Sequence, residues 1–170
     1  SVTGVQTCAL PIFQEAAKLP AEDTVALEIA SVNPSGTTRI SVLRLPRIAN
    51  FDDLDPLRLE PSVKLGFVGP GEAIPGDSHL VIIPGSKSTV SDLTALRREG
   101  WDIDLAAHLR RGGHVIGLCG GYQMLGRAIH DPEGLEGKAG SVAGLGHLDV
   151  ETVLKPDKTL TEVEIGRAHV

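Results

Sequence analysis

The sequence predicts an α/β protein with a doubly wound, mostly parallel β-sheet. Short apolar runs alternate with segments of helical periodicity between Leu80 and Ala128, which is the order expected of a parallel sheet covered by helices. The run 80–83 is continuously apolar, as in a strand buried on both faces. Only 3% of the 170 residues are aromatic and 20 are glycine, a composition that favours an α/β enzyme over a β-sandwich or a base-stacking surface.

The individual elements follow from residue type, periodicity and the turn residues between them. Five segments rich in β-branched or apolar residues are predicted strands: 39–45, 63–68, 79–83, 115–118 and 148–154. Three segments have apolar residues at helical spacing: 90–97 before Gly100, 101–111 before Gly112–Gly113, and 121–128. In the second helix, the predicted apolar stripe is Ile103, Leu105, Ala106 and Leu109. The acidic stretch 51–61, broken by two prolines, is expected to be a loop or a helical turn, and the glycine-rich stretch 131–146 a loop.

Charge and hydropathy exclude several classes of function. There are 16 basic and 22 acidic residues, with a net charge of −6 and no basic block, so neither nucleic acid nor an anionic membrane surface is an expected partner. No apolar run approaches the roughly 18 residues of a membrane span. Residues 1–13 lack the basic start of a secretory signal, and two distant cysteines make no disulfide framework. These features predict a cytoplasmic protein.

The two ends of the chain are interpreted as translated sequencing adapter. Segments 6–12 and 164–170 back-translate into nucleotide strings that are reverse complements over nearly their whole length, and both are similar to a common adapter. The expected organisation is therefore adapter over 1–12 and 164–170, the tail of a preceding domain with its linker over 13–36, and a partial domain over 37–163. Cys8 and His169 then take no part in any site, and Cys119 is the one native cysteine.

The segment Gly117–Gly126 carries the strongest chemical signal. A predicted buried strand runs into Cys119 and a helix begins immediately after it, which is the arrangement of a nucleophile elbow with Cys in place of Ser. Small residues are needed on such a tight turn, and Gly117, Gly120 and Gly121 supply them. A helix N-terminus beside the sulfur favours the thiolate, the species that attacks a carbonyl. The alternative is a buried structural cysteine in a glycine-rich turn.

A second loop, Pro84–Ser88, follows the strand 79–83. Functional loops gather at the carboxyl ends of parallel strands, so this loop and Cys119 are expected to meet there. A backbone N–H at Gly85 and another at Gly120 would stabilise a developing oxyanion. A phosphate-binding P-loop is excluded, because Ser86 separates Gly85 from Lys87. The spacing alone does not distinguish a functional role for Lys87 from that of an ordinary solvated lysine in a loop.

The histidines supply no convincing catalytic base. They are scattered along the chain without metal-ligand spacing, so no metal site is predicted: His79, His108, His114, His130 and His147. His108, beside Arg110 and Arg111 in a helix, is expected to be solvated. His114, at the start of a strand, and His130, in a loop, are weak candidates for the base.

These residues resemble class I, or triad, glutamine amidotransferases, in the form used by the corrin-amidating branch. The elbow Gly117–Gly126 is similar to their nucleophile motif. Four further stretches resemble successive parts of the cobyric acid synthase family: 19–27 the end of its synthetase domain, 44–57 the start of its amidotransferase domain, 83–89 with Asp92–Leu93 its oxyanion loop, and 144–146 with 150–152 its next strand. The resemblance implies a flavodoxin-like sheet of the class I glutamine amidotransferase type, truncated at the C-terminus.

The resemblance also implies a reaction and its participants. Cys119 would attack glutamine to give a thioester and ammonia, with the oxyanion held by the N–H groups of Gly85 and Gly120, and Ser86 and Gln123 in the same oxyanion and substrate-binding set. Ammonia would pass to a synthetase domain that uses ATP and Mg²⁺ to amidate the b, d, e and g carboxylates of adenosylcobyrinic acid a,c-diamide. Glutamine and a corrinoid are therefore the expected partners, and no cofactor is expected in this segment.

The chain departs from the family pattern in two places. The family's catalytic histidine lies beyond Val163, and the ATP-binding domain lies upstream, so this chain alone is expected to be inactive. Other interpretations stay open: an amidotransferase acting on the a and c positions of the corrin ring or coupled to a cell-wall ligase, a cysteine peptidase with the same elbow, and a non-catalytic pseudo-amidotransferase.

Overall fold

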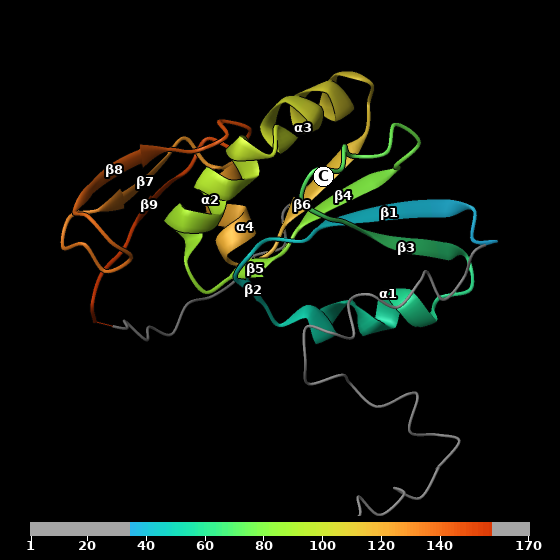
Figure 1. The fold of residues 1–170 in the computed structure, drawn as a ribbon, viewed down its shortest axis with the longest axis horizontal. Coiled ribbons are helices and arrows are strands. Elements are labelled where there is room, and N and C mark those ends of the chain that lie inside the picture. Colours follow the sequence, from blue (N-terminus) through green and yellow to red (C-terminus); the bar gives the residue numbers. More distant parts are fainter. Residues whose placement is uncertain (1–34, 158–170) are drawn as a thin grey trace, which may run out of the picture.

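The computed structural model describes residues 35–157 and is built on a parallel sheet (Figure 1). The four strands of this sheet lie in the order β3-β1-β4-β6: β1 (Thr38–Leu43), β3 (Val63–Val68), β4 (Leu80–Ile83) and β6 (His114–Gly117). Numbered within the sheet, the order is 2-1-3-4, the start of a flavodoxin-like sheet. The predicted adapter segments and most of the predicted domain tail and linker over 13–36 lie outside the described residues.

Helices cover both faces of the sheet, which confirms the predicted doubly wound fold. The short helices η3 (Phe51–Leu54) and α1 (Asp55–Leu59) lie on one face. On the other face lie α2 (Thr89–Arg98), α3 (Trp101–Arg110) and α4 (Gly120–Leu125) (Figure 1). A separate apolar cluster fills each interface. The strand residues Val42, Val81 and Ile83 are fully buried, as continuous apolar strands in a covered sheet should be.

Strand register brings two loops to the same end of the sheet. Leu80 pairs with His114 and Ile83 with Gly117, so β4 and β6 end side by side. Gly85 therefore follows one carboxyl end and Cys119 follows the adjacent one. Beyond β4, β5 (Gly85–Ser86) pairs antiparallel with β2 (Ile48–Ala49), a small ladder that the sequence analysis did not predict.

The region 126–154 forms a second sheet, which corrects two predictions. The predicted helix 121–128 ends at Leu125, and the predicted loop 131–146 contains strand residues. The sheet has the order β8-β7-β9, with β7 (Ala128–Asp131), β8 (Gly140–Ala143) and β9 (Glu151–Val153). Backbone partners distant in sequence explain the error: Arg127 N donates to Val150 O at 2.8 Å, and Gly144 N donates to Arg127 O at 2.8 Å. Of the predicted strand 148–154, residues 151–153 form β9.

Helix α3 corrects two further predictions. Ile103, placed in the apolar stripe, is 70% exposed, and His108, expected to be solvated, is only 1% exposed. The buried face runs through Trp101, Leu105 and His108 at helical spacing. His108 is accommodated because its Nε2 lies 3.0 Å from the His114 carbonyl oxygen, which satisfies a polar ring atom. Gly113 leaves room for the ring, since a Cβ there would overlap the His108 imidazole.

None of the helices between residues 35 and 157 combines the length and the hydropathy needed to cross a membrane.

The close approach of α4 to β4 predicts a large difference between two glycine substitutions. A methyl group at Gly121 would overlap the Ile83 carbonyl oxygen, a backbone atom that cannot move aside, whereas nothing lies within 4 Å of a Cβ built on Gly66 in β3. We expect Gly121→Ala to lower the free energy of unfolding by about 3 kcal/mol. Gly66→Ala should leave it unchanged or raise it by up to about 1 kcal/mol. Urea denaturation of both variants tests this, and equal effects would contradict the packing described.

Candidate active site

The turn between β6 and α4 holds Cys119 in the left-handed half of backbone space. Its φ of 48° and ψ of −109° are rare for a residue with a side chain and mark a strained position. The turn around Cys119 is tight, because a Cβ at Gly117 would lie 2.5 Å from the Gly121 carbonyl carbon. The thiol itself is exposed. An exposed thiol on a strained strand-to-helix turn is the geometry predicted for the elbow.

The β2–β5 ladder fixes the direction of the backbone in the second loop. Lys87 N donates to Arg47 O at 2.9 Å, so these two residues form a hydrogen-bonding pair of the ladder. Because such pairs alternate along an antiparallel ladder, the next pair, Ile48 and Ser86, directs its backbone groups outward. The following pair, Ala49 and Gly85, faces inward again. The N–H of Gly85 is therefore turned toward β2, and that of Ser86 is turned away from it.

The two loops meet at the carboxyl end of the sheet. A Cβ built on Gly85 would lie 3.7 Å from the Cβ of Cys119, and one built on Gly120 would lie 3.2 Å from the backbone nitrogen of Ser86. Gly120 begins α4, and Gly121 N already donates to Leu118 O at 2.8 Å. The first N–H groups of a helix have no partner within the helix. The structure thus brings Cys119, Gly85, Ser86 and Gly120 together as the sequence analysis expected.

Gln123 lies one helical turn after Cys119. Its backbone N donates to Cys119 O at 3.2 Å, and its side-chain Oε1 accepts a hydrogen bond from Thr89 Oγ1 at 3.2 Å. The Gln123 amide is therefore held between α4 and the first turn of α2. Its side chain is half-buried.

Asp92 is a buried carboxylate behind the loop, in the first turn of α2. Its Oδ2 accepts hydrogen bonds from Ser86 Oγ at 2.7 Å and from Arg47 N at 3.2 Å, while its Oδ1 has no partner. Burial raises the pKa of the Asp92 carboxyl above its usual value, although the bonds from Ser86 and Arg47 act in the opposite direction. In the sequence, only the resemblance to a family motif marks Asp92, since helical periodicity does not distinguish a buried aspartate from a solvated one.

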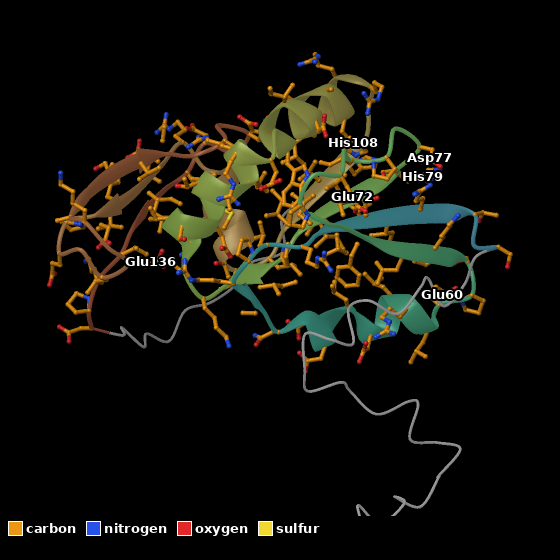
Figure 2. All side chains as sticks on the ribbon, in the orientation of Figure 1. Glu60, Glu72, Asp77, His79, His108 and Glu136 are labelled. Carbon is orange, nitrogen blue, oxygen red and sulfur yellow. The ribbon has the colours of Figure 1, made fainter. Side chains whose placement is uncertain are left out.

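A cleft of about 660 Å³ borders the same loop. It is lined by Pro46, Arg47, Ile48, Lys87, Ser88, Leu135 and Glu136. Lys87 is exposed on its wall, which agrees with a solvated lysine. Glu136 reaches in from the β7–β8 connection, and its Oε2 accepts a hydrogen bond from Val90 N at 2.8 Å at the start of α2 (Figure 2). No local pattern marks Arg47 or Glu136 as a neighbour of this loop, because both are more than 35 positions away from it.

The described histidines lie away from Cys119. His79 and His114 stand at the amino ends of β4 and β6, opposite the elbow, and His108 packs beside His114. Figure 2 shows His79 and His108 at the far end of the sheet from Glu136. His130 belongs to β7, where its ring contacts Ser141 Oγ at 2.8 Å and Glu151 Oε2 at 3.4 Å. His147 follows the far end of α4, with its N bonded to Leu125 O.

Among residues 35–157 there is also no group of three or more His, Cys, Asp or Glu side chains that could hold a metal ion.

The fold and this site define a class of protein: an α/β domain with a cysteine on a nucleophile elbow, beside a loop in which the backbone N–H of Ser86 is directed outward. Comparison with known families identifies the branch. The model of the CobB/CobQ-like glutamine amidotransferase domain matches residues 39–169, and the chain belongs to this family. The predicted fold of the class I glutamine amidotransferase type is thereby confirmed.

Curated relatives with high identity are cobyric acid synthases. The chain is 63% identical over 160 residues to the enzyme of Rhodobacter capsulatus, covering 94% of this chain and 33% of the relative. It is 64% identical over 154 residues to that of Bradyrhizobium diazoefficiens, covering 91% and 32%. The chain thus spans about a third of the length of these relatives. Among solved structures, PurLQS from Thermotoga maritima has a TM-score of 0.45 and 22% identity, covering 52% of this chain and 43% of that chain.

The backbone strain at Cys119 predicts an unusual effect of glycine. Cys119→Gly removes the Cβ that makes a φ of 48° unfavourable, whereas Cys119→Ala keeps it. We expect the glycine variant to be more stable than the alanine variant by about 1 kcal/mol, since relief of strain exceeds the entropy cost of glycine. In α3, Ala107→Gly should instead be destabilising by about 1 kcal/mol. Urea denaturation measures both, and an alanine variant more stable than the glycine variant would contradict the strained turn.

The raised pKa of Asp92 predicts a pH-dependent difference between the chain and Asp92→Asn. A folded-state pKa above the usual 3.8 means that the folded state favours the protonated acid, so this contribution to stability is present at low pH and is lost as the pH rises through the folded pKa. The stability of the parent chain should therefore fall relative to Asp92→Asn as the pH rises above the usual aspartate pKa of 3.8.

A control aspartate should show the opposite slope. A hydrogen bond from Arg39 lowers the pKa of Asp77, so its contribution is present above the usual pKa and is lost as the pH falls. The parent chain should gain stability relative to Asp77→Asn as the pH rises. Urea denaturation across the pH range measures both differences in the free energy of unfolding. If the parent chain and Asp92→Asn show the same dependence of stability on pH, the raised pKa of Asp92 is refuted.

Proposed function

We propose that this domain hydrolyses glutamine at Cys119 and supplies ammonia to an amidation reaction. The observation that carries the proposal is the left-handed backbone of Cys119, which presents its thiol beside the loop that contains Gly85 and Ser86. Membership of the glutamine amidotransferase family supports glutamine as the substrate.

The first chemical step follows from this geometry. The Cys119 thiolate attacks the carboxamide carbon of glutamine, and the carbonyl oxygen becomes an oxyanion. Collapse of the tetrahedral intermediate breaks the carbon–nitrogen bond, releases ammonia once the leaving nitrogen is protonated, and leaves a glutamyl thioester on Sγ. Water then cleaves the thioester, which gives glutamate and restores the thiol.

Two backbone N–H groups are proposed as the oxyanion donors. The sequence analysis assigned them to Gly85 and Gly120. The ladder register turns the Gly85 N–H toward β2, so we place the donor from this loop at Ser86, beside the Gly120 N–H at the start of α4. In this arrangement Gly85 provides the close approach to Cys119. Gln123 is proposed to help bind the substrate from its position between α4 and α2.

The catalytic base is proposed to lie outside residues 35–157. Within that range each histidine lies at the opposite end of the sheet, in the second sheet or beyond the far end of α4. A thiol without a base keeps its place and its oxyanion donors but loses orders of magnitude in rate. We therefore propose that this chain alone captures electrophilic glutamine analogues but does not turn over glutamine.

The whole protein is proposed to act as its relatives' name indicates, as a cobyric acid synthase. Ammonia from Cys119 would amidate the b, d, e and g carboxylates of adenosylcobyrinic acid a,c-diamide in cobalamin biosynthesis, in the cytoplasm. The ATP and Mg²⁺ that activate these carboxylates would bind to the synthetase part of the protein, of which residues 13–36 would be the end. The loop Pro84–Ser88 does not fit a P-loop for ATP phosphates, because it lacks the Gly-Lys-Ser/Thr sequence of that motif.

Labelling with 6-diazo-5-oxo-norleucine, a reactive glutamine analogue, tests the proposal. The L-enantiomer should modify Cys119 at least about tenfold faster than the D-enantiomer, because a built site reads the configuration of the substrate. Excess L-glutamine should slow the reaction. Mass spectrometry of the modified peptide identifies Cys119, and Cys119→Ser should remain unmodified there.

Two results would contradict the proposal in different ways. Equal rates for both enantiomers, with no protection by glutamine, would refute a glutamine site and favour a peptidase or a non-catalytic module. Steady release of glutamate by this chain, lost in Cys119→Ser, would confirm the nucleophile but show that the base lies within the chain.

A further inference from the structure

Asp92 is a buried acid for which the proposed reaction has no use. Its side chain is 0% exposed, although it lies in the first turn of a helix whose neighbouring residue, Ser91, is only half-buried. Burial of a carboxyl group is costly unless both oxygens are satisfied, and Oδ1 of Asp92 has no partner. A residue that only filled space here would be apolar. The favourable contacts of Asp92 are concentrated on its other oxygen.

The hydrogen bonds of Oδ2 run to two segments outside α2. Ser88 N donates to Ser86 Oγ at 3.0 Å, so the hydroxyl hydrogen of Ser86 is free to point at Asp92 Oδ2, 2.7 Å away. Arg47 N donates to the same oxygen at 3.2 Å, immediately before β2. One carboxylate oxygen thus joins α2 to both sides of the β2–β5 ladder.

These hydrogen bonds restrict the movement of Ser86, the residue whose backbone N–H is proposed to bind the oxyanion. Ser86 has one N–H, directed away from β2, and one hydroxyl, committed to Asp92. The hydrogen bond from its hydroxyl and the pairing of β5 with β2 together leave Ser86 little freedom to rotate its peptide plane. The charged groups that face Asp92 are Arg47, from the segment before β2, and Glu136, from the β7–β8 connection.

We propose that Asp92 is the positioning residue of the oxyanion loop: through Ser86 Oγ and Arg47 N it orients the Ser86 N–H toward the oxygen of a carbonyl bound at Cys119. This inference rests on the proposed function, because an oxyanion forms only if Cys119 attacks a carbonyl. Asp92 would hold the loop in place from helix α2 and would not contact the substrate.

Two reactions of the same thiol separate oxyanion stabilisation from nucleophilicity. With p-nitrophenyl acetate, Sγ attacks the carbonyl carbon, a tetrahedral oxyanion forms, and p-nitrophenolate leaves to give an acetyl thioester. With iodoacetamide, Sγ displaces iodide and no oxyanion forms. The ratio of the two second-order rate constants, divided by the same ratio for N-acetylcysteine, reports the oxyanion donors alone. The chain carries Cys8→Ser, so that Cys119 is the one thiol present.

The variants form a matched set. The parent chain should give a normalised ratio of about 10 or more, and Asp92→Ala should lower it at least about threefold, because the Ser86 donor is misplaced while the Gly120 donor remains. Ser86→Ala, which keeps the N–H but removes the tether, should fall with it. Asp92→Asn retains an acceptor oxygen for Ser86 and Arg47 and should keep most of the ratio. Ser41→Ala removes a different buried hydrogen bond, 2.7 Å from Ser41 Oγ to Ser78 Oγ, and should leave the ratio unchanged.

The outcomes distinguish this inference from the proposed function. A normalised ratio of about 1 for the parent chain would show that no backbone N–H stabilises the oxyanion. The inference would then be refuted together with that part of the proposed function. A high parent ratio that Asp92→Ala keeps, with urea denaturation showing the variant folded, would refute the positioning role alone. A fall in Asp92→Ala that Ser41→Ala shares would assign the effect to general loosening and also refute it. Rescue by asparagine with loss in alanine supports it.

Discussion

The contact between the end of β4 and the start of α4 governs the rest of this molecule. Gly121 passes so close to the Ile83 carbonyl oxygen that no side chain fits between them, and Gly117 and Gly121 approach each other in the same way. The chain turns from β6 into α4 between these close approaches through one left-handed residue, Cys119. The exposure of the thiol is thus a result of backbone packing: the strain at one position is maintained by the burial of the helix that follows it.

The layers around this contact each contribute one part of the site. The parallel register of β4 and β6 brings their carboxyl ends together, the β2–β5 ladder directs the backbone of the adjacent loop, and α2 supports that loop from behind with Asp92. The second sheet contributes through the β7–β8 connection, where Asp131 accepts hydrogen bonds from the backbone nitrogens of Leu135 and Glu136 and so places Glu136 at the start of α2. Segments from most of the described chain therefore meet at the carboxyl end of the central sheet.

Sequence reasoning was most successful where structure is determined locally. The central strands are recognisable because β-branched and apolar residues run without interruption to a proline or glycine, and the elbow is recognisable because small residues flank a cysteine at the end of such a strand. The errors arose where distant partners decide. Residues 128–131 and 140–143 become strands through backbone bonds with each other and with β9, and His108 is buried because a carbonyl six residues away satisfies its ring. Asp92 shows the same limit, since its partners Arg47 and Ser86 come from two other segments.

The position of β6 has a consequence for access to the site. Among residues 35–157 it is the outermost strand of the central sheet on the side of β4, and its Ile116 is 45% exposed. The edge of such a strand offers unpaired backbone groups to any neighbouring extended segment. Cys119 follows only two residues after the end of this strand, so a segment that paired along β6 in parallel would also end beside the thiol. A segment that extended the sheet along β6 would therefore also enclose the Cys119 thiol.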